Sequence, residues 1–224
     1  MGAMTSFARM RGGTADGYFS RTENARGPAI VVIQEWWGLQ GQIKSVCDRL
    51  ALAGFTTLAP DLYGGKVVPY HDEPAASAAM SSLDFQAATE DAVRGAVVHL
   101  KKMASKVGLT GFCMGGAVTV IGAARIPELD AAVCFYGLPP ANVASGKDVR
   151  VPLQGHFASE DDWVTPQKVD AFEKDLKAAK KTYEIHRYQG HHAFMNEDRR
   201  EVHDPKAAAL AWDRALTWLR RYLG

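Results

Sequence analysis

Cysteine is scarce in this sequence, and its scarcity argues against two classes of protein. The chain of 224 residues has only three cysteines, which cannot all pair, so it does not resemble a disulfide-rich scaffold. No cysteine has the spacing to another cysteine or to a histidine that zinc sites use. Cys47 falls on the apolar face of a predicted helix and Cys134 within an apolar strand-like run, so both are expected in the core, which leaves Cys113. Reduced thiols in a cytoplasmic setting are the simplest expectation.

Long apolar runs and an excess of one charge are also missing. No apolar run reaches membrane-spanning length, and the first thirty residues lack the apolar core of a signal peptide. The formal net charge of +1 gives no reason to expect nucleic acid or a membrane as a partner. Apolar content of 47% and charged content of 23% are typical of a globular protein. We expect a monomer with one domain over residues 4–224, and residues 1–3 look like a cloning remnant.

What the sequence does contain is a regular alternation of strand-like and helix-like segments. Short apolar runs that suit buried strands alternate with segments whose apolar residues recur at helical spacing. This order predicts an α/β fold with a mostly parallel central sheet and helices on both faces. Strands are predicted over 29–33, 55–59, 107–112, 131–136, 151–157 and 183–188, and helices over 43–50, 85–103, 114–121, 165–179 and 204–223.

Two segments are less regular. Residues 4–27 are polar, and only Tyr18 and Phe19 hint at an edge strand there. Residues 64–82 are rich in Gly, Pro, Ala and Ser without a clear period, which predicts a long loop with a short helix. Long loops in compact domains often form lids or the walls of a substrate site.

The segment around Cys113 is the strongest chemical signal. An apolar run ends in Gly111-Phe-Cys-Met-Gly115, and an Ala/Val/Ile-rich run of helical length follows. This is the G-x-S-x-G pattern of a strand, sharp turn and helix, with Cys in place of Ser. Glycines two residues before and after the nucleophile let strand and helix approach each other. The partial positive charge of a helix N-terminus favours a thiolate at Cys113.

Other reactive side chains follow other predicted strands. Glu35 follows the strand over 29–33, Asp161 and Asp162 follow the strand over 151–157, and His191 and His192 follow the strand over 183–188. Because the carboxyl ends of parallel strands meet at one edge of a sheet, we expect these groups to gather with Cys113. The chain order nucleophile, acid, histidine is that of the α/β-hydrolases. The residues alone leave both acids and both histidines open.

The chain resembles the dienelactone hydrolase family, the carboxymethylenebutenolidase-like branch of the α/β-hydrolases. The resemblance runs nearly end to end, and it is carried by Gln34-Glu35-x-x-Gly38, Pro60-Asp-Leu-Tyr63, Gly111-x-Cys113-x-Gly115-Gly116, the Asp161 segment and Gly190-His-His192-Ala-Phe194. It implies an α/β-hydrolase fold, with Cys113 as the nucleophile. It selects Asp161 over Asp162 and His192 over His191. It also implies that Glu35 contacts the resting thiol and is displaced when substrate binds.

These roles define a hydrolase of small carboxylic esters or lactones that uses no metal or organic cofactor. Cys113 would attack the acyl carbon, His192 would move protons, and Asp161 would orient the imidazole. The backbone N–H groups of Met114 and Trp36 would hold the oxyanion.

The expected substrate differs from the dienelactone after which the family is named. Arginines that bind a carboxylate in namesake members are replaced here by Gly64-Gly65 and Met195-Asn196, and Arg199 lies slightly later. Another ester, lactone or thioester is therefore at least as plausible as the dienelactone. An aromatic-walled pocket with Arg199 is expected from Trp36, Trp37, Tyr63, Trp163 and Phe194.

Two other functions are compatible with a cysteine on such a turn. A thiol redox sensor would use Cys113 beside Glu35 and would not depend on Asp161 or His192. A hydrolase-fold binding protein would have lost catalysis altogether. The well-spaced acid and histidine after the turn favour the hydrolase.

Overall fold

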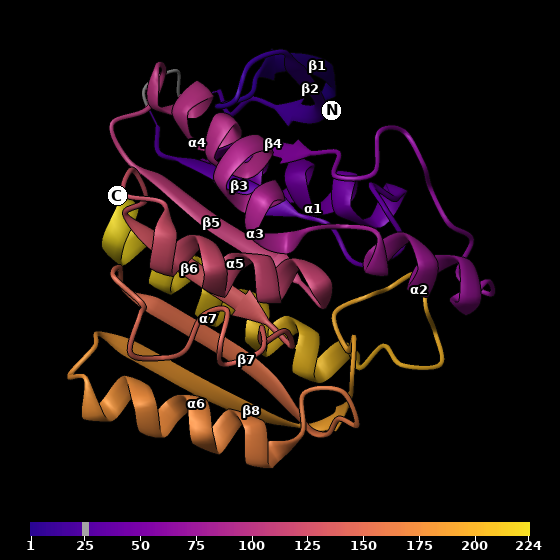
Figure 1. Cartoon of the computed structure of the whole chain (residues 1–224), viewed down its shortest axis with the longest axis vertical. Coiled ribbons are helices and arrows are strands. Elements are labelled where there is room, and N and C mark those ends of the chain that lie inside the picture. The colour runs from indigo at the N-terminus through magenta and orange to yellow at the C-terminus, as the bar shows by residue number, and fades with distance from the viewer. Residues whose placement is uncertain (24–26) are drawn as a thin grey trace.

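The computed structural model describes residues 1–23 and 27–224, and its strands form one central sheet (Figure 1). The described residues form eight strands in the order β1-β2-β4-β3-β5-β6-β7-β8. β2 runs antiparallel to its neighbours β1 and β4, and the pairs from β4 to β8 are all parallel. The strand bounds are β1 Ala3–Ala8, β2 Thr14–Ser20, β3 Ala29–Ile33, β4 Thr56–Pro60, β5 Val107–Phe112, β6 Ala131–Phe135, β7 Leu153–Glu160 and β8 Tyr183–His191.

Helices cover both faces of this sheet, as the alternating pattern predicted. α1 and α7 pack on one face, where Ile30 and Val32 point, and α4 packs on the other, where Val31 and Ile33 point. α5 and α6 share the face of α4, as Figure 1 shows. The bounds are α1 Gly41–Leu52, α2 Glu73–Ser81, α3 Phe85–Ala88, the π-helical turn η1 Thr89–Val93, α4 Arg94–Lys101, α5 Met114–Arg125, α6 Pro166–Ala178 and α7 Pro205–Leu223.

The central strands match the predicted apolar runs because both of their faces are covered. Every residue of β3, β4, β5 and β6 is buried. Such strands need apolar side chains on both faces rather than in alternation. Cys47 and Cys134 are fully buried in these layers, as expected.

The N-terminal segment is more ordered than the sequence predicted. β1 and β2 form an antiparallel hairpin that extends the sheet beyond β4, and Tyr18 and Phe19 lie in β2. Ala3, expected to be a cloning remnant, pairs with Phe19 in this hairpin. Residues 24–26, at the end of the predicted polar segment, lie outside the described residues.

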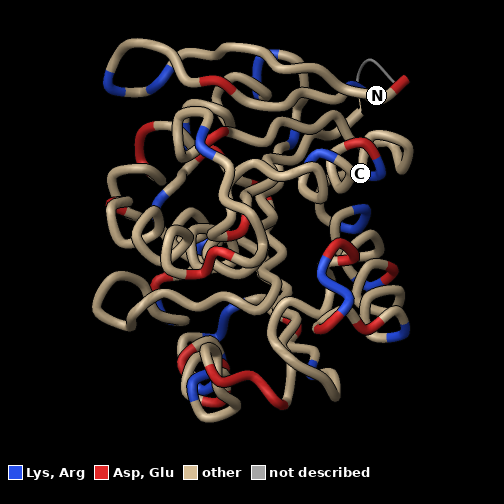
Figure 2. Tube along the Cα trace, turned by 90° about the vertical axis from the view of Figure 1, so that its right-hand side faces the viewer, with Lys and Arg blue, Asp and Glu red and all other residues tan. Residues whose placement is uncertain are grey.

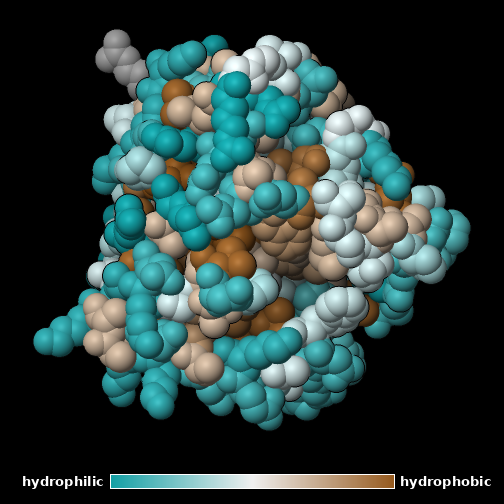
Figure 3. All heavy atoms as spheres, viewed as in Figure 1, coloured by the Kyte–Doolittle hydropathy of each residue, from teal (hydrophilic) through white to brown (hydrophobic). Residues whose placement is uncertain are grey.

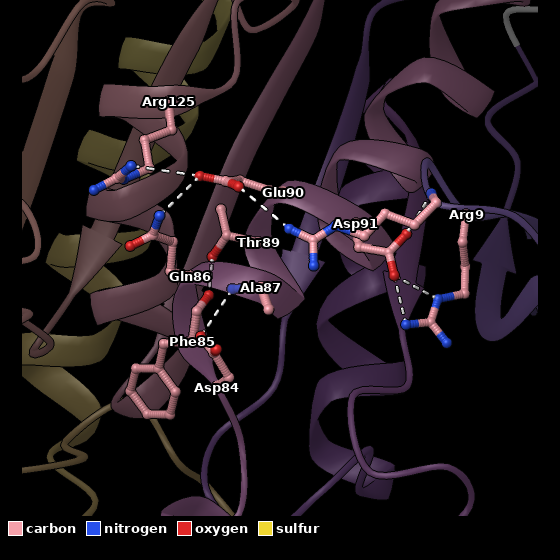
Figure 4. A network of polar contacts seen from close by, with 10 residues as sticks. Arg9, Asp84, Phe85, Gln86, Ala87, Thr89, Glu90, Asp91 and Arg125 are labelled. Carbon is pink, nitrogen blue, oxygen red and sulfur yellow. Dashed lines mark hydrogen bonds and ion pairs between the residues drawn. The ribbon is translucent and has the colours of Figure 1, made fainter.

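The helix predicted over 85–103 contains a π-helical turn, η1, between α3 and α4. Side chains from distant elements bind this turn (Figure 4). Asp91 accepts hydrogen bonds from the Arg9 side chain and the Arg11 backbone, and Arg125 of α5 pairs with Glu90. The turn therefore ties the N-terminal hairpin to the helix that follows Cys113. Single π-helical turns inside α-helices are often found near functional sites.

Two smaller features refine the prediction. The segment over 64–82 contains α2, whose N-terminus is capped by the side chain of Asp72. Thr165 occupies the N-cap position of α6, but its side chain makes no capping hydrogen bond there.

The surface is mixed in charge and polarity. Figure 2 shows basic and acidic residues interspersed along the trace, consistent with the net charge of +1. Figure 3 shows a mostly hydrophilic face with apolar residues between the polar ones near its middle. Within the described residues, no helix combines the length and apolar character needed to cross a bilayer.

Candidate active site

The candidate site lies where the chain changes direction across the sheet. β3 lies between β4 and β5 in the sheet. The chain therefore adds β4 on one side of β3 and then adds β5 to β8 on the other side. Ligands of open α/β sheets bind at such a point, beside the carboxyl ends of the strands. Here those ends are followed by Glu35 and Trp36 after β3 and by Cys113 after β5.

Cys113 occupies a strained turn between β5 and α5. Its φ is 55°, in the left-handed region that residues with a side chain rarely adopt. A Cβ on Gly115 would lie 2.5 Å from the carbonyl oxygens of Ile33 and Gln34, and a Cβ on Gly111 would clash with the Gly115 carbonyl. Both glycines of the motif are therefore needed for the close approach of helix and strands, as predicted.

Asp161 and His192 form a direct pair beside this turn. His192 Nδ1 lies 2.7 Å from Asp161 Oδ2. The other oxygen of Asp161, Oδ1, accepts hydrogen bonds of 2.8 Å from the backbone N–H groups of Trp163 and Val164. Asp161 is buried and both of its oxygens have partners. The carboxylate is thus fixed in the orientation that holds the imidazole.

The charges around His192 favour its protonated form. Burial alone would lower the pKa of His192, but the charge of Cys113 and the hydrogen bonds with Asp161 and Cys113 raise it from 6.5 to about 10. Burial also opposes ionisation of Asp161, yet its bonds to His192 and to the two backbone N–H groups lower its pKa. Cys113, His192 and Asp161 are therefore electrostatically coupled.

The neighbouring acid and histidine lie elsewhere. Asp162 is exposed. His191 is also exposed, and its Nδ1 lies 3.3 Å from the backbone oxygen of Glu160. The geometry therefore favours Asp161 and His192 as the pair that faces Cys113.

Glu35, two residues after β3, is buried. Its Oε2 accepts a 2.8 Å hydrogen bond from Asn196 Nδ2, and its Oε1 accepts a 3.2 Å bond from the Tyr136 hydroxyl. Burial raises the pKa of Glu35, while Asn196, the charge of His192 and Tyr136 act against this rise. The resemblance implied a contact with the resting thiol, and here both oxygens are bonded to other residues instead.

A cavity of about 170 Å³ connects these groups. Its walls include Cys113, His192 and Glu35, and also Trp36, Trp37, Trp163 and Arg199 from the predicted substrate residues. The edge of Trp163 packs on Trp36 at 5.4 Å between ring centroids, and its side chain is largely exposed. The guanidinium of Arg199 lies 5.3 Å from the ring centroid of Trp37.

Two predicted substrate residues do not line this cavity. Phe194 is fully buried and packs against Tyr136 and Tyr188, so the structure places it in the core. Tyr63 is not among the lining residues, and its hydroxyl is 3.2 Å from Met114 Sδ. Met114 is the first residue of α5, and its N–H is one of those that have no acceptor within a helix.

Several residues of the site could not be identified from the sequence. Tyr136 and Asn196 bind Glu35, and Glu73 and Met80 of α2 line the cavity, which makes the 64–82 segment part of the wall. Two signals were available: Tyr136 is the last residue of a predicted strand, and the long loop predicted over 64–82 was a candidate wall of a substrate site. Within the described residues, no group of three or more His, Cys, Asp or Glu side chains could hold a metal ion.

Comparisons with known proteins found matches over nearly the whole chain. The family described as the dienelactone hydrolase family matches residues 15–223. The chain is 34% identical over 235 residues to a protein of Aquifex aeolicus named "Putative carboxymethylenebutenolidase" and 35% identical over 235 residues to the protein Usf of Aquifex pyrophilus. In both cases the match covers 100% of each chain.

Solved structures show the same fold. A crystal structure titled "Putative Dienelactone Hydrolase", from Klebsiella pneumoniae, is 29% identical with a TM-score of 0.81, and the match covers 98% of this chain and 100% of that one. A dienelactone hydrolase-like promiscuous phosphotriesterase from metagenomic libraries is 21% identical with a TM-score of 0.84, and the match covers 100% of this chain and 99% of that one. At 21% identity, the similarity to the phosphotriesterase concerns the fold alone.

Proposed function

The chain belongs to the dienelactone hydrolase family and is a hydrolase of carboxylic esters or lactones, and from this premise we propose that Cys113, His192 and Asp161 form its catalytic triad. The single observation that carries the proposal is the 2.7 Å contact between His192 and Asp161 beside a cavity that Cys113 also lines. The redox-sensor alternative gives no role to this pair and is not favoured.

The proposed reaction has two steps. In the first, the Cys113 thiolate attacks the acyl carbon, the C–O bond of the ester breaks, and His192 donates its proton to the departing oxygen. This leaves an acyl-thioester on Cys113. In the second step, His192 takes a proton from water, the resulting hydroxide attacks the acyl carbon, and the C–S bond breaks to release the acid. Asp161 keeps the His192 proton on Nδ1 between these transfers.

The oxyanion of each step needs hydrogen-bond donors on the opposite side of the acyl carbon. In this proposal they are the backbone N–H groups of Met114, at the N-terminus of α5, and Trp36, in the turn after β3. Losing one such donor typically costs about 3 kcal/mol of transition-state stabilisation. The close packing of Gly115 on β3 holds the two turns at a fixed separation.

The substrate in this proposal is a small ester or lactone with a flat, apolar part. The volume of about 170 Å³ suits a small acyl group. Trp36, Trp37 and Trp163 supply aromatic surface, and Arg199 adds a positive charge to the cavity wall. We also infer that the protein acts in the cytoplasm as a monomer without nucleic-acid partners. Its three unpaired cysteines support the compartment, and size-exclusion chromatography would test the oligomeric state.

The test compares the wild type with Cys113→Ala. Turnover of an activated aryl ester and of an enol-lactone should fall to the uncatalysed rate in Cys113→Ala, with the thermal unfolding midpoint almost unchanged. Mass spectrometry of the quenched wild type during turnover should reveal an acyl adduct on Cys113. Undiminished turnover in Cys113→Ala, or an adduct on a different residue, would refute the assignment.

A further inference from the structure

Tyr136 links two parts of the site without lining the cavity. Its hydroxyl donates the 3.2 Å hydrogen bond to Glu35, and its ring packs edge-on against the imidazole of His192 with 5.2 Å between centroids. The residue is fully buried, and Phe194 packs on it from another side at 5.3 Å. It therefore touches both a buried carboxyl group and the proposed base.

The backbone of Tyr136 is strained to make these contacts. It follows β6 with a φ of 36°, which is unfavourable for a residue with a side chain. Two neighbouring hydrogen bonds hold it there, from the Tyr136 N–H to the His156 carbonyl at 2.8 Å and from the Cys113 N–H to the Phe135 carbonyl at 3.1 Å. Strain of this kind persists where the surrounding structure fixes it, and it clusters at functional sites.

Asn196 completes the surroundings of Glu35. It is fully buried, and its Nδ2 donates the 2.8 Å bond to the Oε2 of Glu35. Its Oδ1 accepts a 3.1 Å bond from the Asp198 N–H, which fixes the orientation of the amide. The two oxygens of Glu35 are thus each bound by one neutral donor whose own position is fixed.

We propose that Tyr136 and Asn196 are positioning residues that fix the orientation of the Glu35 carboxyl group near His192 and keep its two oxygens bonded away from the Cys113 sulfur. This role deepens the proposed function and rests on it. Neither residue lines the cavity, so their effect should be on turnover and not on substrate binding.

The charges that face Glu35 support this arrangement. Burial is the largest influence on Glu35 and raises its pKa, and the bonds from Asn196 and Tyr136 and the charges of His192 and Arg199 act against this rise. The hydroxyl of Tyr70 is also close enough to be affected by the charge of Glu35. Removing a donor should therefore favour protonation of Glu35, and a neutral Glu35 no longer stabilises the imidazolium of His192.

The first experiment removes one hydroxyl group. Tyr136→Phe keeps the ring against His192 and deletes the donor to Glu35, together with the bond between the hydroxyl and the Met195 backbone. We expect kcat for an activated ester to fall about tenfold, the usual effect of one hydrogen bond to a charged group, with KM unchanged. The acidic limb of the pH profile should move to higher pH. Asn196→Asp, which replaces the donor by an acceptor, should act in the same direction.

Tyr188→Phe is the matched control. Tyr188 is also buried and also packs on Phe194, but its hydroxyl contacts the His156 ring at 2.8 Å rather than Glu35. This variant should leave kcat and the pH profile unchanged. An equal loss in both tyrosine variants would mean that the effect is general packing, and would overturn the proposal.

The decisive comparison repeats Tyr136→Phe in a Glu35→Gln background. If Tyr136 acts through Glu35, the hydroxyl deletion should change neither kcat nor the pH profile of Glu35→Gln. A similar loss in both backgrounds, or no loss in either, would overturn the proposal.

A second measurement separates this proposal from the proposed function. The pKa of His192, followed by 15N NMR titration, should fall in Tyr136→Phe and should not change further in the double variant. If Cys113→Ala retained full turnover, the triad would be refuted, but this titration would still decide whether Tyr136 and Asn196 hold Glu35 near His192. An unchanged His192 titration in Tyr136→Phe would overturn their positioning role.

Discussion

Replacing Asp161 by Asn tests the central pair with the least change in shape. Oδ1 of Asp161 accepts two backbone N–H bonds, from Trp163 and Val164, and Oδ2 faces His192 Nδ1. An asparagine that keeps its oxygen on the two N–H groups must present its NH₂ to His192. The imidazole then has to accept at Nδ1 and carry its proton on Nε2, so it can no longer accept a proton there.

The opposite orientation of the asparagine is unfavourable for the same reason. It would place the NH₂ against the two backbone N–H groups, and each unsatisfied buried donor costs about 1–3 kcal/mol. Burial lowers the pKa of His192, but Cys113 and Asp161 together raise it from 6.5 to about 10, so Asp161 supplies part of the stabilisation of the imidazolium. We therefore expect Asp161→Asn to reduce kcat by about 10³- to 10⁴-fold.

The assay is steady-state turnover of an activated ester at saturating substrate, combined with urea unfolding. Because the asparagine oxygen keeps its two backbone bonds, the free energy of unfolding should change by only about 1–2 kcal/mol. Asp162→Asn is the control: Asp162 is exposed, so its replacement should leave kcat unchanged. A loss below tenfold in Asp161→Asn, or a comparable loss in Asp162→Asn, would refute the assigned geometry.

Three further predictions concern charge and packing. Cys113→Ala should lower the pKa of His192 from about 10, and an unchanged NMR titration would contradict the coupling. Asp91→Asn should destabilise the fold by about 1 kcal/mol, because its arginine partner is 45% exposed. Hydrogen bonds outweigh burial and hold the pKa of Asp91 below 3.8, so this contribution is present above that pH and lost as pH falls through the folded pKa. Urea unfolding at pH 7 and pH 3 measures the difference, which should shrink at pH 3. Gly115→Ala should lower the free energy of unfolding by about 3 kcal/mol or prevent folding. Gly41→Ala is the control and should leave stability nearly unchanged, because the space around Gly41 is open.

The sequence predicted the elements whose pattern depends on local rules. The strand over 29–33 was predicted with its observed bounds because a strand covered on both faces must be apolar throughout. The turn at Cys113 was predicted because close packing there requires glycine at 111 and 115. The strand β1 was missed because only Phe7 of its six residues is buried, so it shows no apolar run.

Other features depend on contacts between distant segments and left no local signal. The π-helical turn η1 is bound by Arg9 and Arg11, which lie about eighty residues earlier in the chain. Phe194 was expected in the cavity wall as one of the five aromatic residues that suggested an aromatic-walled pocket. Ala193 between them has a φ of 65°, which turns the chain so that His192 faces the cavity and Phe194 is buried in the core.

The strained residues explain why parts of the site escaped prediction. The described residues include four non-glycine residues with positive φ, and three of them are Cys113, Tyr136 and Ala193. Sequence rules expect glycine at such positions, and each exception costs about 1–3 kcal/mol. Glycine would remove the strain at Cys113 or Tyr136 but would also remove the sulfur or the phenol. A fold that tolerates this cost at two adjacent strand ends, β5 and β6, is one in which the side chains matter more than the local stability. We therefore expect Tyr136→Gly to lose turnover even where the relief of strain offsets part of the lost packing.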